Sequence, residues 1–334
     1  MVSARAHTCT YVGTPQAQIN INHSYIIIEH KGGPVMILVT GATGYIGRHL
    51  VKRLVSQGER PRCLVRDPQR AATILPADKV DFVHGDTTQP SLLENAVQGI
   101  DTIVHTAFIT ADRKAQSGAF YEETNVHGTS NLIAAAKTAG VKRIVELSGL
   151  GTKPDKPGSY MEGRYLAEKM LIDSGLDWTI IRPSVLFGKD ASFIKGLVDL
   201  LRSAPIAPLI GGGKTMFQPI YVEDVVTVLL KVLEEPTRTN KKIYTIGGLE
   251  YYSFSQIYDL LLNAMGKNRP KVYAPTFMVG IGAAVMEAVL PKPPLTKAAM
   301  TLFSFDNTTD LNSVERDFGF TPLSFKQYLH ENGV

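Results

Sequence analysis

Residues 36 to 47 read Met-Ile-Leu-Val-Thr-Gly-Ala-Thr-Gly-Tyr-Ile-Gly. The apolar start predicts a buried parallel strand, and residues 48 to 55 continue as an amphipathic helix. Between them, Gly41, Gly44 and Gly47 allow a tight turn, a close approach of a pyrophosphate to the backbone, and close packing of the helix on the sheet. The free N–H groups at the helix start favour an anion. This strand-to-helix context predicts a dinucleotide-binding turn and disfavours a purely structural one.

The composition is that of an ordinary globular protein. The chain has 334 residues, with 44% hydrophobic and 20% charged residues, and this length is typical of about two domains. Its net charge of +4, without a Lys/Arg block, argues against a nucleic-acid partner. Two cysteines, Cys9 and Cys63, cannot form a disulfide framework, which favours a reducing, cytoplasmic location. We expect Cys63 to be an inert core residue.

Two further classes are disfavoured by pattern. No stretch of about 18 uncharged apolar residues is present, so no spanning helix is expected. No His, Cys, Asp or Glu cluster has metal-ligand spacing, so no metal site is expected. His105 is expected to pack inside the sheet and not to bind a ligand.

Strands alternate with helices after the glycine turn. Apolar runs at residues 61–65, 80–83, 101–105, 141–147 and 177–181 predict five more strands. This pattern predicts an α/β protein with a doubly wound parallel sheet, the Rossmann architecture, covered by helices on both faces. After Pro183 the alternation loosens, which predicts a smaller, mostly helical C-terminal substrate lobe.

We therefore expect three segments. Residues 1–35 are predicted to be a poorly ordered N-terminal extension without the features of a secretory signal, so that Met36 would be the true start. A short edge strand over residues 25 to 29 is the alternative. Residues 36–183 are predicted to form the dinucleotide-binding domain and residues 184–334 the substrate lobe.

The residue after the second strand meets the adenosine ribose in such domains. Arg66 stands there, and with Arg48 it suits a 2′-phosphate, so NADP(H) is favoured over NAD(H). Asp67 is the counter-evidence, and the alternative is that Arg66 is a solvated charge. Asp86 is expected to accept from the adenine amino group or, alternatively, to cap the next helix. The predicted cofactor contacts are Gly41, Thr43, Gly44, Tyr45, Ile46, Gly47, Arg48, Arg66, Asp86, Thr87, Thr106, Ala107 and Pro183.

Over residues 36 to 330 the chain resembles the atypical branch of the short-chain dehydrogenase/reductase superfamily. The motifs that carry the resemblance are the glycine turn, Gly85-Asp86, Val104-His105-Thr106-Ala107, Asn125, Thr179 to Ser184 and Gln218 to Val225. Residues 291–296, 306–307 and 318–324 are similar to the group that contains the NAD(P)H-binding accessory subunit of respiratory complex I.

Active members of that superfamily use a Ser/Thr, a Tyr and a Lys, and the resemblance implies such a set here. The tyrosine gives or takes a proton while hydride moves. The literal Y-x-x-x-K is Tyr165 to Lys169. In the family, however, the lysine stands about 18 residues before the arginine that ends a strand, and from Arg182 that spacing reaches Arg164.

The implied catalytic residues are therefore Tyr160, Arg164 and Ser148. Five residues rotate a helical side chain by about 140°, so the literal motif would face away from the cofactor. Arginine in place of lysine does not provide a point charge in the same way. Ser148 is followed by Gly149, and its alternative role is to satisfy the backbone at a turn. The residues expected to bind the cofactor match the family pattern, whereas those expected to transfer the proton depart from it.

Residues 277 to 290 are apolar nearly all round, with Glu287 as the only charge. A helix of this length spans about 21 Å, which is too short for a hydrocarbon core of about 30 Å. We expect it to be buried against the substrate lobe. The alternative is a lid or membrane-facing surface near a lipophilic substrate such as a quinone.

The leading hypothesis is an NAD(P)H-binding oxidoreductase that transfers hydride to or from a carbonyl, a quinone or an activated double bond of a small molecule. One alternative is an eroded NADPH-binding structural or redox-sensing subunit. A further alternative is a sugar-nucleotide epimerase or dehydratase.

Overall fold

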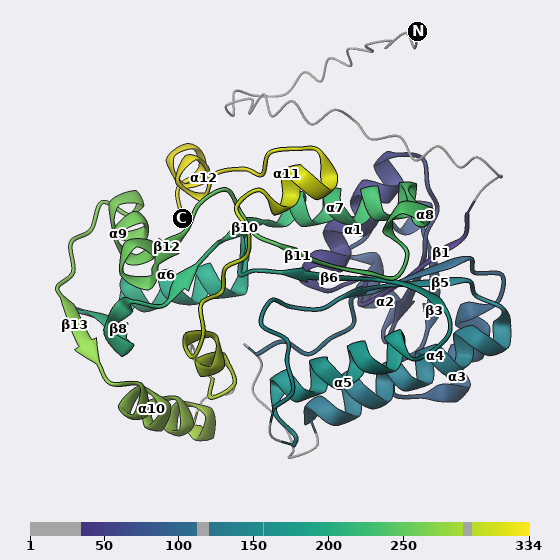
Figure 1. Cartoon of the computed structure of the whole chain (residues 1–334), viewed down its shortest axis with the longest axis horizontal. Coiled ribbons are helices and arrows are strands. Elements are labelled where there is room, and N and C mark those ends of the chain that lie inside the picture. The colour runs from purple at the N-terminus through teal and green to yellow at the C-terminus, as the bar shows by residue number, and fades with distance from the viewer. Residues whose placement is uncertain (1–34, 112–119, 156, 290–295) are drawn as a thin grey trace, which may run out of the picture.

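The computed structural model describes residues 35–111, 120–155, 157–289 and 296–334 (Figure 1). The predicted extension at residues 1–35 and its alternative edge strand lie outside these residues, apart from Val35. Within the described ranges, no helix combines the length and apolar character needed to cross a bilayer. No group of three or more potential metal ligands lies together in those ranges either.

A seven-stranded parallel sheet forms the centre of the molecule, in the order β11-β6-β5-β4-β1-β2-β3. The predicted doubly wound parallel sheet is therefore confirmed. Its strands are β1 (Ile37–Thr40), β2 (Arg62–Val65), β3 (Asp81–His84), β4 (Thr102–His105), β5 (Arg143–Leu147), β6 (Asp177–Pro183) and β11 (Lys242–Ile246).

Helices cover both faces of this sheet because successive strand residues point to opposite sides. Ile37 and Val39 pack in one core with Leu50 of α1 (Tyr45–Ser56) and Leu229 of α7 (Val222–Glu234). Leu38 packs in the other core with the second set of helices. That set comprises α3 (Pro90–Val97), α4 (Gly128–Ala139) and α5 (Tyr160–Ile172), which lie together below the sheet in Figure 1.

The remaining elements of this part are short. They are α2 (Pro68–Ala72), α8 (Pro236–Thr239), α11 (Ser313–Phe318), a 3₁₀ turn at Ala77–Lys79, and a π-helical turn, η2, at Glu122–His127. The predicted helix at 122–139 thus begins with a wider turn. There the Asn125 amide is fully buried and bonds both backbone groups of Ile109.

The second lobe is built on a separate core. Its helices are α6 (Ser192–Ser203), α9 (Phe254–Ala264), α10 (Thr276–Val289) and α12 (Phe325–Asn332), with 3₁₀ turns at Gly211–Gly213 and Ala299–Phe303. Three two-stranded sheets join them: β7 (Leu186–Phe187) with β10 (Ile220–Tyr221), β9 (Met216–Phe217) with β12 (Tyr252–Ser253), and β8 (Ala207–Ile210) with β13 (Lys271–Ala274).

The later part of the chain also returns to the sheet. β11 pairs with β6 along five residues, from Lys242 opposite Thr179 to Ile246 opposite Pro183, and α7 packs on α1. The division at residue 183 stays a prediction, because β11, α7, α8 and α11 come from beyond it and pack with the central sheet.

Two predicted core residues lie where they were expected. Cys63 is fully buried, and burial raises the pKa of its thiol to about 12. His105 is fully buried between Thr40 and Thr129, and burial lowers the pKa of its imidazole to about 3.

The apolar helix predicted at 277–290 is present as α10, but the expectation that it is buried is wrong. Phe277, Ile281 and Val289 are each more than 60% exposed, and Ala283 is its only fully buried residue among those described. The helix contacts the rest of the lobe along one side only.

Candidate active site

The turn between β1 and α1 leaves no room for a side chain at Gly41 or at Gly47. Gly41 has φ +69°, and a Cβ there would lie 2.7 Å from the Thr106 carbonyl carbon. A Cβ on Gly47 would lie 2.2 Å from the carbonyl oxygen of Gly41. The strand end, the turn and the helix therefore pack with no room for side chains, as close approach of a pyrophosphate to the backbone requires.

The first turn of α1 is open to an anion. Gly44 is its N-cap and offers no side-chain oxygen, and Tyr45, Ile46 and Gly47 follow without a carboxylate. The amides and the positive end of the helix dipole are then available to a phosphate. The residues of this turn fit a dinucleotide.

A cavity of about 480 Å³ leads from this turn into the second lobe. Its inner part is formed by Gly44 to Gly47, Thr106, Ser148, Tyr160 and Arg164. Apolar side chains of the lobe line its outer part; they include Phe193, Leu197, Leu200, Ile210, Val279, Met286, Leu302 and Phe303. Among the described lining residues, Arg164 is the only charged one.

Tyr160 and Arg164 lie one helical turn apart at the start of α5. Ser159 caps the helix by accepting from the Glu162 N–H at 3.1 Å, which sets the register. Arg164 Nε donates to Tyr160 Oη at 2.6 Å, and the guanidinium carbon lies 5.1 Å from the tyrosine ring centre. Arg164 is buried, and its Nη1 has no hydrogen-bond partner among the described residues.

Ser148 follows the end of β5 and lines the same cavity. Its Oγ lies 3.2 Å from the Thr152 hydroxyl, which itself donates to the Gly149 carbonyl. Gly149 passes beside the Arg164 guanidinium, where an added Cβ would be in ordinary contact at 3.6 Å. Ser148 is thus held near the pair on α5 and also takes part in the turn.

A buried acidic pair lies near Arg164. Glu168, on the next turn of α5, forms a two-point ion pair with Arg182 at the end of β6. Glu146 in β5 is fully buried, and neither carboxylate oxygen has a hydrogen-bond partner in the described part of the chain. Burial raises the pKa of Glu146 well above its ordinary value, and the nearby Glu168 raises it further. Arg164 and Arg182 oppose this rise.

The literal Y-x-x-x-K residues do not line the cavity. Lys169 is exposed, and its amine pairs with Asp173 at 2.6 Å on the outer face of α5. Tyr165 is half-buried on the same helix. The structure thus brings Tyr160 and Arg164 to the cavity and turns the other pair away.

The predicted ribose contacts lie at the ends of β2 and β3. The Arg66 side chain is 79% exposed, and its Nε lies 3.8 Å from an Asp86 oxygen. Asp67 caps α2 by accepting from the Arg70 N–H at 2.9 Å. Asp86 also accepts from the Thr88 N–H at 2.9 Å, so it closes its own turn.

The other predicted cofactor residues fall into two groups. Tyr45, Ile46, Thr106 and Pro183 line the cavity with the glycines, whereas Gly41, Thr43, Arg48, Ala107 and Thr87 do not. Thr87 is buried, and its carbonyl accepts from Asn131. Arg48 lies 3.6 Å from Asp190 of the second lobe.

Phe108 is a site residue that was not singled out from the sequence. Its ring centre lies 5.3 Å from the Arg164 guanidinium carbon and 4.6 Å from the His105 ring. Arg164 therefore lies against two aromatic rings, in a cation–π arrangement. The sequence feature that could have indicated this role is the position of Phe108 directly after the small residues Thr106 and Ala107.

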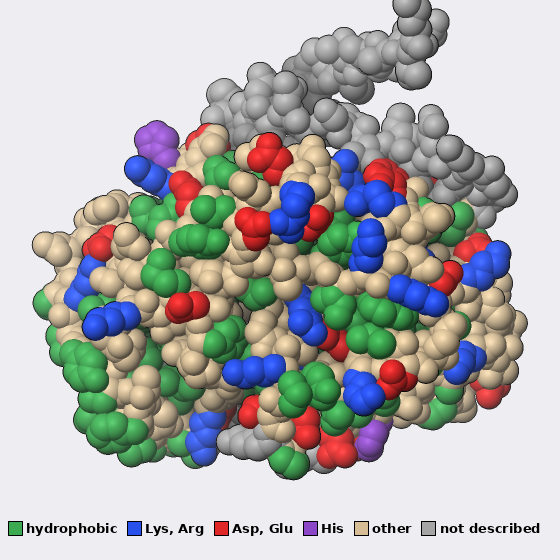
Figure 2. Space-filling model, in the orientation of Figure 1, with side chains coloured by type: hydrophobic (Ala, Val, Ile, Leu, Met, Phe, Trp, Pro, Cys, Tyr) green, Lys and Arg blue, Asp and Glu red, His purple; other side chains and the backbone are tan. Residues whose placement is uncertain are grey.

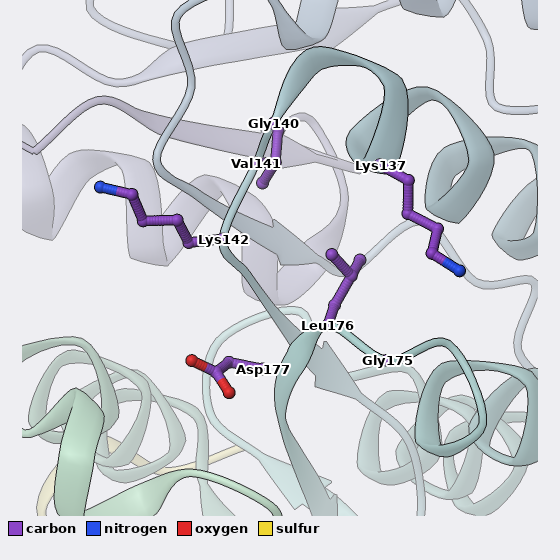
Figure 3. Close-up of a pocket in the computed structure, with 7 residues that line it drawn as sticks. All are labelled: Lys137, Gly140, Val141, Lys142, Gly175, Leu176 and Asp177. Atoms are coloured by element: carbon purple, nitrogen blue, oxygen red, sulfur yellow. The ribbon is translucent and has the colours of Figure 1, made fainter.

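A second, shallow depression of about 460 Å³ lies at the amino ends of β5 and β6. Figure 3 shows that the amines of Lys137 and Lys142 point away from each other there, with Asp177 apart from both. Ligands of doubly wound sheets bind at the carboxyl ends of the strands, so this depression is on the opposite edge of the sheet from the candidate site.

Comparison with known proteins identifies the family of the chain. A family model described as NAD(P)H-binding matches residues 41–236, which is more than half of the chain. The NAD(P)H azoreductase of Xenophilus azovorans is 31% identical over 235 residues, covering 70% of this chain and 74% of that protein. The mitochondrial NADH dehydrogenase [ubiquinone] 1 alpha subcomplex subunit 9 of Arabidopsis thaliana is 24% identical over 311 residues, covering 88% and 76%.

A 3 beta-hydroxysteroid dehydrogenase/Delta 5-->4-isomerase of Mycobacterium tuberculosis is 28% identical over 326 residues, covering 86% of each chain. Among solved structures, a dTDP-glucose 4,6-dehydratase from Streptomyces venezuelae shares the fold, with a TM-score of 0.68 at 23% identity, covering 89% of this chain and 98% of that one. With the glycine turn and the cavity in place, the chain belongs to the NAD(P)H-binding family of the atypical short-chain dehydrogenase/reductase superfamily.

Proposed function

We propose that the protein is an NADPH-dependent oxidoreductase that moves hydride to or from a carbonyl, quinone or activated double bond of a lipophilic small molecule. Tyr160, Arg164 and Ser148 are the proposed catalytic residues. The observation that carries the proposal is the hydrogen bond from Arg164 Nε to Tyr160 Oη inside the cavity that starts at the glycine turn. Residues 36–183 would chiefly bind the cofactor, and residues 184–334 would chiefly shape the substrate pocket.

The geometry of Tyr160 suits a proton donor. Because its oxygen accepts from Arg164, its own O–H is free to donate to a substrate oxygen. In the reducing direction, bound NADPH would supply the hydride that the substrate carbon receives. The substrate oxygen takes the Tyr160 proton, and the phenolate left behind lies beside a permanent guanidinium charge. Ser148 would be a second donor for the same oxygen once its hydroxyl turns from Thr152 to the substrate.

The lining of the cavity supports a lipophilic substrate. Its outer part is apolar, with Phe193, Leu197, Leu200 and Phe303 among the lining residues. A steroid dehydrogenase is among the relatives, and a substrate of that polarity matches this lining. Such molecules partition into membranes, so we propose that the site is supplied from a lipid surface.

The preference for NADPH rests on two side chains. Arg66 is exposed at the position that meets the adenosine ribose and is available to a 2′-phosphate. Asp67, the carboxylate that would favour NAD, is engaged as the cap of α2. The remaining proposed contacts are those of the glycine turn and the ends of β3, β4 and β6.

A second candidate function is a non-catalytic NADPH-binding subunit. Arginine stands where the family resemblance implies a lysine, and a complex I subunit is among the relatives. A sugar-nucleotide enzyme is less well supported, because the described lining offers a sugar diphosphate no cation besides Arg164.

Turnover separates these functions. Purified protein with NADPH is assayed against quinones and lipophilic ketones, and we expect NADPH consumption by the wild-type protein and a rate about 10² or more lower for Tyr160→Phe. Saturable NADPH binding with no consumption on any of these substrates would favour the subunit function. Consumption that Tyr160→Phe leaves unchanged would contradict the proposed role of Tyr160.

A further inference from the structure

Among the described residues, most of the large exposed apolar side chains gather at one corner of the second lobe. Eight of these 14 lie on or next to β8, β13 and α10: Ile206, Val272, Tyr273, Phe277, Met278, Ile281, Val285 and Val289, with exposures from 39% to 74%. Figure 2 shows hydrophobic atoms over the lower left of the molecule, where Figure 1 places α10 and β13. A surface helix usually presents polar residues to solvent.

The two sides of α10 have different surroundings. Val279 and Met286, seven residues apart and so on one side of the helix, line the cavity of the candidate active site. Ile281 and Val285, four residues apart, lie on the opposite side and are 63% and 58% exposed. The helix is therefore a thin apolar wall with the substrate cavity behind it and solvent in front of it.

Cationic residues flank this wall in the sequence. Between residues 266 and 300 the sequence carries five cationic residues and one acidic residue, so the segment's net charge of +4 equals that of the whole chain. Lys267 and Lys297 are exposed and have no ion pair among the described residues. Lys271 pairs with Asp259, and the Glu287 carboxylate accepts from the backbone N–H of Lys297.

Apolar side chains flanked by cations match an anionic bilayer. The large residues would enter the boundary between headgroups and acyl chains, while the cations meet the headgroup phosphates. A second copy of this chain is a poor match, because the same positive charge would face itself across the interface.

We propose that α10 and β13 form a docking surface for anionic membranes, with Phe277, Met278, Ile281, Val285 and Val289 inserted into the lipid interface. The docking itself depends only on this surface. That it delivers lipophilic substrate through the α10 wall rests on the function proposed above.

The test is co-sedimentation of the full-length, cofactor-free protein with vesicles. We expect binding to vesicles of phosphatidylcholine and phosphatidylglycerol, weaker binding to phosphatidylcholine alone, and weakening by salt. Ile281→Gln/Val285→Gln should lower the partition coefficient roughly tenfold or more. The matched control is Ile172→Gln/Ile243→Gln, two residues of about 40% exposure on other surfaces, which should bind as the wild type does.

Charge is tested in the same way. Lys267→Gln/Lys297→Gln should lose binding to anionic vesicles, while Lys52→Gln/Lys137→Gln, two exposed lysines elsewhere, should retain it. Equal binding by the wild type and Ile281→Gln/Val285→Gln would overturn the proposal. The proposal would also be overturned if the wild-type protein did not bind vesicles. This holds whether the protein is a monomer or forms a dimer that Ile281→Gln/Val285→Gln disrupts.

The outcome is separable from turnover. If the protein binds vesicles in this pattern but does not consume NADPH, the docking surface is supported and the proposed reaction is contradicted. If the protein consumes NADPH with a short water-soluble ketone but does not bind vesicles, the proposed reaction is supported and the docking surface is contradicted.

Discussion

Arg164 Nε donates a 2.6 Å hydrogen bond to Tyr160 Oη from one turn farther along α5. The bond joins a buried permanent charge to a phenol that lines the cavity. A helix places residues four apart on the same side, so this pairing is a direct consequence of where α5 begins. The phenol is thereby oriented with its proton free and its conjugate base next to a cation.

Removing the Tyr160 hydroxyl should stop proton transfer with little effect on folding. We expect Tyr160→Phe to lower kcat by about 10² or more, which is the usual range for loss of a general acid. Steady-state kinetics on a lipophilic ketone measures this. The control is Tyr165→Phe, on the other face of α5, which should keep wild-type kcat. Equal losses in the two variants would mean that the register assigned to α5 is wrong.

The charge of Arg164 should matter more to kcat than to KM. Arg164→Met leaves the phenolate without its cation, and we expect kcat to fall about tenfold or more. Arg164→Lys keeps a positive charge and should retain part of the activity that Arg164→Met loses, since the family resemblance implies a lysine at this position. Melting temperatures should be measured alongside, because Arg164 is buried and near Glu146. Arg164→Met kinetics equal to those of the wild type would contradict the account.

Arg66 should discriminate between the two nicotinamide nucleotides. We expect Arg66→Ala to raise the Kd for NADPH about tenfold to a hundredfold, as loss of a hydrogen bond to a charged group does. The Kd for NADH should hardly change. Arg60→Ala is the control, since Arg60 is an exposed arginine paired with Asp81. A similar loss for both nucleotides in Arg66→Ala would argue against a 2′-phosphate contact.

Glu146 should make the protein less stable as pH rises. Because burial raises its pKa in the folded chain, the folded state keeps a proton that the unfolded chain releases above its ordinary pKa of 4.5. Stability is then lost from about that pH upward, through the folded pKa. Glu146→Gln removes this titration.

Urea unfolding at a series of pH values checks the effect. We expect the free energy of unfolding of Glu146→Gln to exceed that of the wild type at pH 8, with the difference shrinking toward pH 4. Parallel curves for the two proteins would show that Glu146 does not hold an extra proton in the folded state.

Local patterns were sufficient for the first six strands and the glycine turn. The strand-to-helix turn around Gly44 carries its constraint within twelve residues, and the apolar runs report burial directly. The positions of Tyr160 and Arg164 on one side of α5 follow from helical periodicity. These features depend on neighbours in the sequence.

Other features depend on distant parts of the chain. The pairing of β11 with β6 joins residues about 60 apart in the sequence. No local pattern in Lys242–Ile246 indicates which strand it pairs with. Apolar composition predicted burial for α10, yet its outer residues are exposed because nothing in the described chain covers them. Phe108 reaches Arg164 only because β4 and α5 are brought together by the sheet.

We propose that a nicotinamide dinucleotide lies with its pyrophosphate against the turn between β1 and α1. Gly44 lines the cavity there, and a Cβ on it would lie 2.9 Å from the Gly41 carbonyl oxygen. Gly280 in α10 is the matched control, because a Cβ there meets nothing within 4 Å.

The measurement is titration with NADPH, followed by its fluorescence, of the wild type, Gly44→Ala and Gly280→Ala, each first checked for folding by circular dichroism. We expect saturable binding by the wild type and Gly280→Ala, and an affinity lower by about tenfold or more in Gly44→Ala. Equal affinity in all three proteins, or no saturable binding by the wild type, would contradict it.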